Sequence, residues 1–311
     1  MRIAIAGGTG FVGRELTRQL IEAGHDVVWL SRRPGRVREL GFDPDALAEV
    51  RFDHRAPESG WTEQVGAADA VVNLSGHPIA SRWNSTVKHA LRESRVGTNR
   101  AIVRALADAA TTHPDRSRVL VSASGVGIYG DRSEEVLDED SDPGADWLAT
   151  LACEWEAAAR EAERITGTRV VCVRTGLVLG TEGLVPRLAL PMKLFVGGPV
   201  GSGRQWTTWI HIHDIAAVYR HAIESAEVSG PVNACAPEPV RMRDLTAALG
   251  RALRRPSWLP VPGLALRVVL GEVAPYMLYS QRAEPRALGQ TGFEYAYADL
   301  DAAVAQVVSE L

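Results

Sequence analysis

A glycine pattern within the first thirteen residues constrains the fold most strongly. The apolar run Arg2–Ala6 leads directly into Gly7, and Gly10 and Gly13 follow at three-residue steps. The next residues recur at the spacing of one helix face: Val12, Leu16, Leu20 and Ala23. A strand, a glycine turn and a helix in this order predict a turn whose backbone approaches a pyrophosphate closely. The N–H groups and partial positive charge of the helix N-terminus favour phosphates at the same place.

Short apolar runs alternate with helix-period stretches through the first two thirds of the chain. We predict six strands there and one further strand: Arg2–Ala6, Asp26–Leu30, Val50–Asp53, Ala70–Leu74, Val119–Ser122, Arg169–Arg174 and Thr207–Ile212. This alternation predicts a parallel sheet with helices on both faces. Right-handed crossovers make such a sheet doubly wound. The predicted fold class is therefore α/β, with a Rossmann-type doubly wound sheet.

The sequence pattern changes after residue 235, where prolines separate short stretches with helical periodicity. Two of these patterns, Arg241–Leu253 and Leu300–Val308, are amphipathic. We predict a nucleotide-binding domain over residues 1–235 and a smaller, mostly helical lobe over residues 236–311. Residues 180–205 are a further candidate for this lobe.

Two local predictions concern acidic residues. The run Glu134–Asp142 is expected to be a solvated loop whose end, Asp142-Pro143, suits the start of a helix. Asp214 is expected to start a helix over Ile215–Ser225. Its neighbours His211 and His213 lack a third ligand at useful spacing, so we predict no metal there.

Composition excludes several classes of protein. The 34 Lys+Arg against 38 Asp+Glu give a net charge of −4, which argues against nucleic acid or an anionic membrane as the main partner. No uncharged apolar stretch reaches the 18 residues of a membrane span. The three cysteines, Cys153, Cys172 and Cys235, lack the spacing of a disulfide framework or a zinc site. With no signal peptide at the N-terminus, we expect a cytoplasmic protein.

The end of the second predicted strand favours one dinucleotide over the other. An acidic residue at this point would bind the ribose 2′-hydroxyl of NAD. The chain instead reads Trp29-Leu30-Ser31-Arg32-Arg33. A serine and guanidinium groups suit a 2′-phosphate through charge-assisted hydrogen bonds. We therefore predict NADP(H), with Asp53 either facing the adenine or serving as an ordinary loop residue.

These features resemble the extended short-chain dehydrogenase/reductases, the group of the sugar-nucleotide epimerases and dehydratases. The matching motifs are Gly7-x-x-Gly10-x-x-Gly13, Asn73-Leu74-Ser75-Gly76, Ser122-Ala123-Ser124 with Ile128-Tyr129-Gly130, and Val173-Arg174-Thr175-Gly176 with Val178-Leu179-Gly180. The resemblance implies an NADP(H)-type Rossmann domain and a C-terminal substrate lobe. The residues predicted to bind the cofactor are Gly7, Thr9, Gly10, Phe11, Val12, Gly13, Ser31, Arg32, Asp53, Leu74, Ser75 and Gly76.

A narrower resemblance covers nearly the whole chain. It is to an atypical epimerase-like branch with a C-terminal domain of unknown function, some members of which carry a cell-division-inhibitor name. The motifs are Arg82-Trp83, Ser94-Arg95-Val96 with Thr98, Gly201–Trp206, Trp209–Asp214, Asn233–Val240, Ser280-Gln281-Arg282 and Gly292-Phe293. Members of this branch mostly lack a defined substrate, so the resemblance implies an unidentified small molecule. Dimers are usual in the broader group, and by that analogy a homodimer is expected.

The catalytic pattern of the broader group is missing from this chain. Its enzymes use Tyr-x-x-x-Lys, in which the lysine and the oxidised nicotinamide lower the tyrosine pKa for proton exchange with the substrate. Lysine occurs here only at Lys88 and Lys193, and neither lies four residues after a tyrosine. If Glu156 matches the acidic residue usual in that helix, Leu148 and Ala152 occupy the Tyr and Lys positions. Neither side chain transfers a proton.

Three residues are candidates for the missing catalytic role. Ser124 lies one residue from the position usual in the broader group, and is either near the nicotinamide or structural. Tyr129 is either a replacement acid or a packed aromatic residue. His211 carries an imidazole that titrates near neutrality, with a hydrogen-bonded structural histidine as the alternative.

Tryptophans and cations in two loops are candidates for a substrate pocket. A pocket for a flat or apolar group bearing an anion would draw on Arg82, Trp83, Arg204, Gln205, Trp206 and Trp209. The alternative is that these tryptophans belong to the core.

Three functional hypotheses follow. The first is an NADP(H)-dependent oxidoreductase on a small carbonyl or hydroxyl substrate. The second is a non-catalytic NADP(H)-binding regulator or scaffold, and the third is a nucleotide-sugar epimerase.

Overall fold

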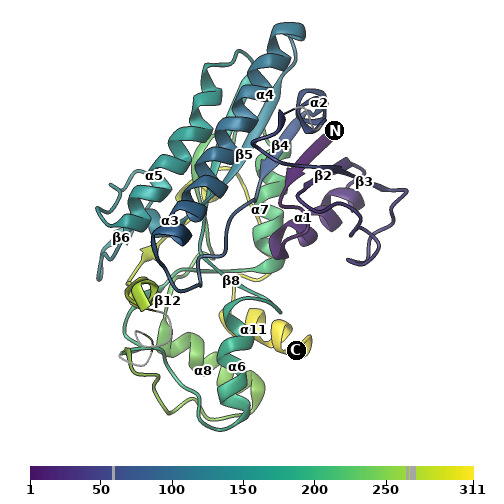
Figure 1. The fold of residues 1–311 in the computed structure, drawn as a ribbon. Coiled ribbons are helices and arrows are strands. Elements are labelled where there is room, and N and C mark those ends of the chain that lie inside the picture. The colour runs from purple at the N-terminus through teal and green to yellow at the C-terminus, as the bar shows by residue number, and fades with distance from the viewer. Residues whose placement is uncertain (58–59, 264–265, 267–270) are drawn as a thin grey trace.

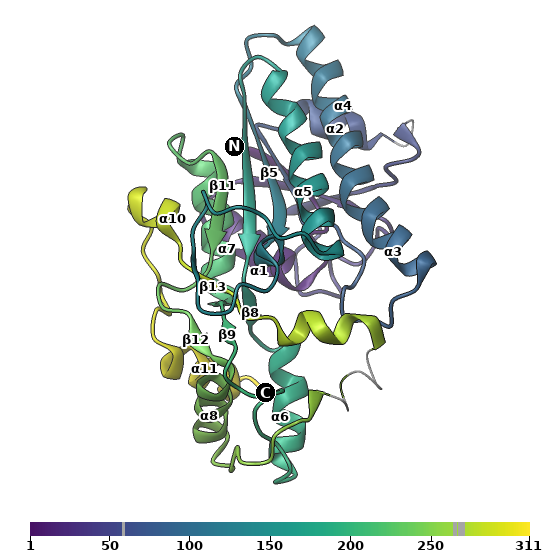
Figure 2. The ribbon, with the colours of Figure 1, turned by 90° about the vertical axis from the view of Figure 1, so that its left-hand side faces the viewer.

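The computed structural model describes residues 1–57, 60–263, 266 and 271–311. Its centre is a seven-stranded parallel sheet with the order β11-β7-β5-β4-β1-β2-β3 (Figures 1 and 2). The strands are β1 (Arg2–Ala6), β2 (Asp26–Ser31), β3 (Leu47–Arg51), β4 (Ala70–Asn73), β5 (Arg118–Gly125), β7 (Thr168–Thr175) and β11 (Gly230–Ala234). The predicted α/β doubly wound fold is confirmed.

Two predicted strands differ from those in the structure. The third strand was expected at Val50–Asp53, but β3 ends at Arg51 because its register pairs Val27 with Leu47 and Ser31 with Arg51. Asp53 therefore follows the strand in a loop. The run Thr207–Ile212 is not a strand of the main sheet. It divides into two short strands, β9 (Trp206–Thr207) and β10 (Trp209–His211), and the first residue of a helix.

Helices cover both faces of the sheet because alternate strand residues point to opposite sides. On one face, Ile3 and Ile5 pack with the apolar side of α1 and with α7. On the other, Ala4 and Ala6 pack with α2, α4 and α5. The α-helices with described bounds are α1 (Phe11–Glu22), α2 (Trp61–Ala67), α3 (Ser85–Arg92), α4 (Thr98–Thr112), α5 (Trp147–Arg160), α6 (Leu184–Lys193), α7 (Ile212–Glu224), α8 (Met242–Leu253), α10 (Arg286–Gln290) and α11 (Leu300–Ser309).

Shorter helical segments join several of these helices. A π-helical turn, Glu93–Gly97, connects α3 to α4. The 3₁₀ segments with described bounds are Val126–Tyr129, Glu161–Arg164 and Gly271–Leu278.

A second lobe lies below the sheet in Figure 1 and consists mainly of α6, α8 and α11. Its core brings together Leu188 and Met192 of α6, Leu249 of α8 and Val304 of α11. Residues of the 180–205 segment therefore pack with the C-terminal helices. Short ladders complete this part of the chain: β8 (Leu177–Leu179) with β10, β9 with β12 (Val240–Arg241), and β6 (Val136–Leu137) with β13 (Arg282–Ala283).

Among the described residues, no helix combines the length and the apolar character needed to cross a membrane.

Candidate functional site

An open cleft of about 500 Å³ lies beside the glycine turn. Its walls come from the ends of β2 and β3, the loop after β4, and the junction of α3 with α4. Nine of the residues predicted to bind the cofactor line it: Gly7, Thr9, Gly10, Ser31, Arg32, Asp53, Leu74, Ser75 and Gly76. The structure thus gathers at one cleft residues that are up to 69 positions apart in sequence.

The glycine turn depends on the absence of side chains. Gly7 has φ +87°, and a Cβ atom there would lie 2.8 Å from the carbonyl carbon of Leu74. A Cβ on Gly13 would lie 2.4 Å from the carbonyl oxygen of Gly7. The helix α1 begins after Gly10 with no side-chain cap and no acidic residue in its first turn. Its N-terminal N–H groups and positive dipole end are therefore left for an anion.

Three predicted cofactor residues do not line the cleft with their side chains. Val12 packs against the sheet core, and Gly13 is buried against the turn. The Phe11 ring packs against Gly180, where a Cβ atom would lie 2.3 Å from the ring. These residues form the first turn of α1, so they offer the cleft their backbone N–H groups.

One end of the cleft is rich in cations. Ser31 ends β2, and Arg51 lies beside it at the end of β3. The guanidinium groups of Arg32 and Arg51 are exposed and form no hydrogen bond or ion pair within the described part of the chain. Arg51 was missed from the sequence because the third strand was predicted to end two residues too late, at Asp53. The corrected strand puts its side chain next to Ser31.

Asp53 and His54 form the neighbouring wall. Asp53 accepts a hydrogen bond from the backbone N–H of Arg55 (3.0 Å), as a loop aspartate often does. His54 is half-buried, its Nε2 has no partner among the described residues, and burial lowers its pKa. Sequence reasoning did not identify His54, which carries no motif of its own.

A buried cation lies behind the opposite wall. Arg95, in the π-helical turn, donates hydrogen bonds from Nη1 to the carbonyl oxygens of His77 (3.1 Å) and Leu91 (3.2 Å). Its guanidinium lies over the ring of Trp155, 5.0 Å from the centroid. Burial lowers the Arg95 pKa to about 10, and no carboxylate of the described residues pairs with it. A Cβ on Gly76 would lie 3.1 Å from Nη2, so glycine is what lets this cation approach the cleft wall.

Ser124 belongs to a buried ionic cluster. Its hydroxyl donates to Oε1 of Glu156 (2.7 Å). Arg174 holds the same carboxylate through two bonds, Nε to Oε1 and Nη2 to Oε2, each 2.9 Å. All three side chains are less than a tenth exposed. The serine proton is therefore already engaged, which supports the structural alternative for Ser124.

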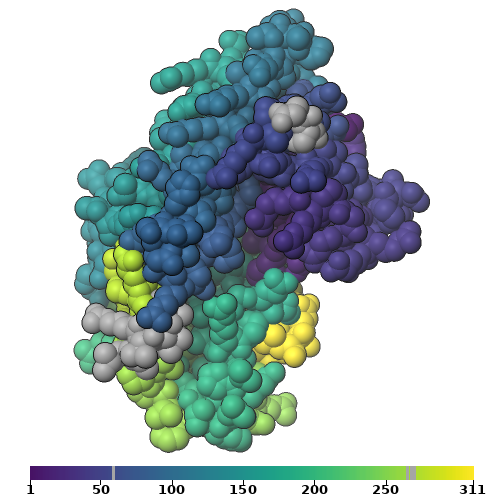
Figure 3. Space-filling view, viewed as in Figure 1, coloured from purple at the N-terminus to yellow at the C-terminus, as the bar shows by residue number. Residues whose placement is uncertain are grey.

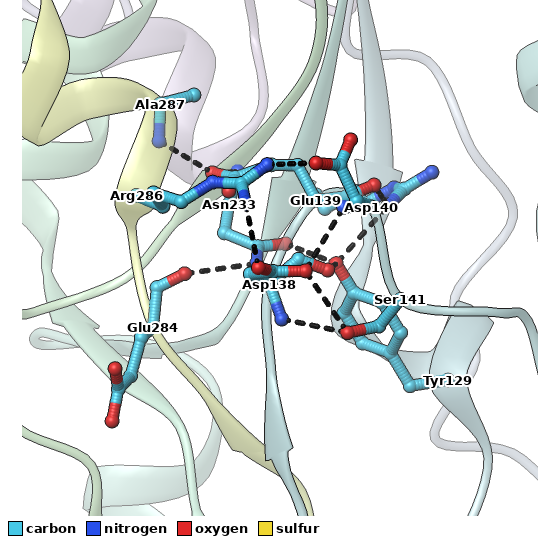
Figure 4. A network of polar contacts seen from close by, with 10 residues as sticks. Tyr129, Asp138, Glu139, Asp140, Ser141, Asn233, Glu284, Arg286 and Ala287 are labelled. Carbon is cyan, nitrogen blue, oxygen red and sulfur yellow. Dashed lines mark hydrogen bonds and ion pairs between the residues drawn. The ribbon is translucent and has the colours of Figure 1, made fainter.

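Tyr129 is completely buried in an adjoining network (Figure 4). Its hydroxyl accepts from Nη1 of Arg174 (3.0 Å) and lies 2.7 Å from Oδ1 of Asn233 and 2.9 Å from the carbonyl oxygen of Asp138. Burial raises the Tyr129 pKa to about 12. A phenol in this setting holds its proton and packs as part of the core, which is the alternative expected for it.

The acidic run Glu134–Asp142 is not the simple solvated loop that was expected. It contains β6, and Glu139 at its centre is buried. Oε1 of Glu139 accepts from the backbone N–H groups of Asn233 (2.9 Å) and Ala287 (3.2 Å), as Figure 4 shows. The carboxylate therefore joins strand β11 to the C-terminal segment. The following helix, α5, starts at Trp147 with Asp146 as its cap, not at Asp142.

His211 also has a structural role. It is buried, its Nδ1 accepts from the backbone N–H of His213 (3.2 Å), and Nε2 lies 2.9 Å from Oε1 of Gln306. This arrangement makes His211 the N-cap of α7, which therefore begins at Ile212 and not at Ile215. Burial lowers its pKa. Asp214 does not start the helix; its carboxylate accepts from the backbone N–H groups of residues 296 and 297.

The predicted substrate residues do not form one wall. Trp83 packs edge-on against Trp147 (4.8 Å) and against Tyr276 (5.0 Å). Trp209 is buried in the lobe core, where Nε1 donates to the carbonyl oxygen of Glu238 (3.0 Å). Its role is therefore the core role left open for the tryptophans.

The other predicted substrate residues lie mainly in the loop before β9. Two guanidinium groups stack on the Trp206 ring, with the Cζ atoms of Arg241 and Arg282 at 3.9 Å and 4.7 Å from its centroid. Gln205 is buried and donates to the carbonyl oxygen of Val200 (2.8 Å), and Arg204 is exposed. Arg82 lies beside Gly271, the first residue of the 3₁₀ segment Gly271–Leu278, where a Cβ atom would be 3.3 Å from its Cγ. The internal partners of these side chains, not the pattern of residue types, decide their positions.

The positions matched to the missing Tyr and Lys hold apolar contacts. Leu148 packs on Gly127, where a Cβ atom would lie 3.0 Å from the leucine side chain. Ala152 is buried beside Ile128 and Leu137. Neither position offers an acid or a base.

Comparisons with known proteins agree with this architecture. A family model described as the NAD dependent epimerase/dehydratase family matches residues 3–235, and a model described as a domain of unknown function matches residues 261–307. The chain is 36% identical to the epimerase family protein YfhF of Bacillus subtilis over 100% of this chain and 99% of the relative. It is similar to the crystal structure of human epimerase family protein SDR39U1 (isoform 2) with NADPH, with a TM-score of 0.84, 33% identity and full coverage of both chains. The structure of MoeE5 with UDP-glucuronic acid and NAD shares the fold at 18% identity, with a TM-score of 0.79 over 99% of this chain and 98% of that one.

Proposed function

Because the chain belongs to the NAD dependent epimerase/dehydratase family, we propose that it binds NADP(H) in the cleft and transfers hydride between this cofactor and a small carbonyl or hydroxyl substrate. The observation that carries the proposal is the set Ser31, Arg32 and Arg51 at one end of the cleft, opposite the uncapped start of α1. The human relative whose structure contains NADPH supports the same cofactor.

The residues present fit a dinucleotide with a 2′-phosphate. The backbone of the glycine turn would hold the pyrophosphate in the space that side chains at Gly7 and Gly13 would fill. Ser31, Arg32 and Arg51 would hold the 2′-phosphate, with no carboxylate at the end of β2 to repel it. When bound, the reduced cofactor supplies the hydride for a carbonyl carbon.

Carbonyl reduction also requires a proton at the substrate oxygen. Ser124 donates to Glu156, Tyr129 is buried with its pKa raised, and His211 caps α7. Each of these side chains is committed to an internal hydrogen bond. We therefore assign the proton to water that enters the open cleft, and not to one of the three candidates.

The second candidate function is a non-catalytic NADP(H)-binding regulator or scaffold. It is favoured by the burial of Ser124, Tyr129 and His211 and by the apolar contacts of Leu148 and Ala152. A nucleotide-sugar epimerase ranks third because it needs a base that oxidises a sugar hydroxyl, and the matched positions hold none. A cytoplasmic location and a homodimer complete the proposal.

The cofactor assignment is tested by titrating the protein with NADPH and with NADH. Charge-assisted contacts of about 1.5–3 kcal/mol predict that NADPH binds at least roughly tenfold more tightly. Arg32→Ala and Arg51→Ala should each weaken NADPH binding and leave NADH binding unchanged. Arg38→Ala, an exposed arginine outside the cleft lining, is the matched control. Equal affinity for both nucleotides in the unmodified protein would refute the 2′-phosphate assignment.

Turnover separates the first two functions. The protein should oxidise bound NADPH when at least one class of small carbonyl compound is added. The loss of nicotinamide absorbance measures this reaction. Tyr129→Phe should retain this activity if water supplies the proton. Tight NADPH binding without turnover across aldehydes, ketones and keto acids would favour the regulator.

A further inference from the structure

The end of the second lobe exposes large apolar side chains on adjacent segments. Five of them, on residues 190–196 and at residue 258, are more than half exposed: Leu190 (63%), Leu194 (65%), Phe195 (54%), Val196 (51%) and Trp258 (67%). Leu259 (40%) completes the group. We call this surface the lobe tip. It follows the C-terminal end of α6 and lies at the lower end of the molecule in Figures 1 and 3.

Two segments of backbone hold the lobe tip together. The N–H of Leu259 donates to the carbonyl oxygen of Gly197 (3.2 Å), and that of Val261 donates to Pro199 (2.9 Å). A Cβ on Gly198 would lie 2.4 Å from the carbonyl oxygen of Leu259, so the two segments are in close contact. The apolar side chains of both segments therefore present one surface.

The backbone itself helps to expose an aromatic ring. Phe195 has φ +64°, a left-handed conformation that phenylalanine rarely adopts. Its ring remains exposed and carries the guanidinium of Arg255 at 4.8 Å from the centroid. Burial of the ring within the chain does not offset the strain of this backbone conformation, because the ring stays in solvent. This points to a partner outside the chain.

The two segments that carry the lobe tip contain basic but no acidic residues. Neither residues 184–213 nor residues 245–263 contain an Asp or Glu, although the whole chain carries a net charge of −4. Four exposed cations there, Arg187, Lys193, Arg254 and Arg255, have no carboxylate partner within the part of the chain that the structure describes. The acidic residues that make the net charge negative therefore lie outside these two segments. The net charge does not reveal that the segments themselves are basic.

We propose that the lobe tip is a docking site for an anionic lipid surface. Exposed Trp, Phe and Leu side chains amid Arg and Lys are the composition that inserts into the boundary between headgroups and acyl chains. The long stems of the cations reach the headgroups while the apolar side chains enter below them. A second copy of this chain fits less well because a symmetric contact would place the same unpaired cations against each other.

This proposal is independent of the proposed catalytic function. It also revises the expectation from composition that an anionic membrane is not a partner. That expectation used the net charge and the absence of a spanning segment, and neither measures how charge is distributed. The contact is peripheral, because it uses side chains of the lobe end and no spanning helix.

The test is co-sedimentation of the full chain with vesicles. One set contains phosphatidylcholine alone and the other an equal mixture of phosphatidylcholine and phosphatidylglycerol. The protein should partition at least tenfold more strongly onto the anionic vesicles, and added salt should reduce this partition. Each cation near such a surface contributes roughly fivefold, so the fourfold variant Arg187→Gln, Lys193→Gln, Arg254→Gln, Arg255→Gln should lose at least a factor of about ten.

An apolar variant tests insertion separately from charge. Phe195→Asn with Trp258→Ser removes both exposed rings, and asparagine tolerates the left-handed backbone. It should weaken anionic-vesicle binding severalfold and abolish the quenching of tryptophan fluorescence by brominated lipid. Arg38→Gln and Val136→Ser, exposed residues outside the second lobe, are the matched controls and should change neither signal. Unchanged circular dichroism shows that each variant is folded.

Three results would overturn the proposal. One is equal or absent binding to the two vesicle types. Another is binding to polyglutamate, lost in the fourfold variant, without binding to anionic vesicles, which would assign the surface to an acidic protein. The last is self-association in sedimentation velocity that Trp258→Ser abolishes, which would assign it to a second copy.

Discussion

Replacing Arg95 by methionine tests how a buried cation shapes the nucleotide cleft. The guanidinium lies behind Gly76 with two backbone carbonyls and the Trp155 ring as partners. No carboxylate among the described residues neutralises it. Methionine keeps the unbranched stem and most of the volume but removes the charge. The substitution therefore separates packing from electrostatics.

The structure sets the expected magnitudes. Burial lowers the Arg95 pKa from 12.5 to about 10, which corresponds to roughly 3 kcal/mol of cost for holding the charge in the fold. The two bonds to the carbonyls of His77 and Leu91 offset this, at about 1.5–3 kcal/mol each for a charged donor. The two effects offset each other to within about 3 kcal/mol, so Arg95→Met should change the free energy of unfolding by no more than about 3 kcal/mol. Breaking a buried ion pair would cost about 3–5 kcal/mol instead.

NADPH binding should respond more than stability. A unit charge about 10 Å from a phosphate, at an effective dielectric constant of about 20, contributes about 1.7 kcal/mol, or roughly a factor of ten in Kd. We expect Arg95→Met to weaken NADPH binding by about this factor, and Arg95→Lys to retain most of the affinity. The assays are urea unfolding and fluorescence titration of NADPH. A loss of more than about 3 kcal/mol in stability with unchanged NADPH affinity of the folded variant would refute the reasoning and leave Arg95 a purely structural residue.

Three further predictions concern the turn, the buried phenol and a capping histidine. Gly13→Ala places a Cβ 2.4 Å from the carbonyl oxygen of Gly7. The substitution should therefore lower the free energy of unfolding by about 1–3 kcal/mol and abolish measurable NADPH binding. Wild-type behaviour in thermal unfolding and in NADPH titration would contradict this expectation. Tyr129→Phe leaves a buried Arg174 donor without its acceptor and should cost about 1–3 kcal/mol in urea unfolding with NADPH affinity unchanged. Burial lowers the pKa of His211 below 6.5, so the unfolded state binds more protons and stability falls as pH decreases below about 6.5. His211→Asn, which keeps a cap for α7, should flatten this dependence, and an unchanged pH profile would show that other groups cause it.

The sequence was sufficient for the parts of the site that depend on backbone. The glycine turn leaves no room for a side chain at Gly7 or Gly13, because a Cβ atom at either position would collide with backbone atoms. The motif after β4 likewise placed Leu74, Ser75 and Gly76 at the cleft. These residues stand in short sequence motifs, so they can be recognised before the fold is known.

Register and burial were beyond the reach of the sequence. The third strand is set by the pairing of Val27 with Leu47 and of Ser31 with Arg51. The predicted strand ended two residues later, so it wrongly put Asp53 at the strand end in place of Arg51. Glu139 looked solvated within an acidic run, yet two backbone N–H groups from distant segments bury its carboxylate. Partners far apart in sequence decide these positions, and the residue types alone do not name the partners.

The absence of the usual catalytic pair and the burial of Tyr129 have a common structural origin. Leu148, at the position matched to the missing tyrosine, packs on Gly127 within the 3₁₀ turn Val126–Tyr129. That turn carries Tyr129 inward to Arg174. A larger side chain at residue 148 would collide with the turn, and a lysine at Ala152 would lie uncharged or unpaired in an apolar cluster. Restoring Tyr-x-x-x-Lys by substitution would therefore disrupt the core that replaced it, and any chemistry in this cleft must proceed without that pair.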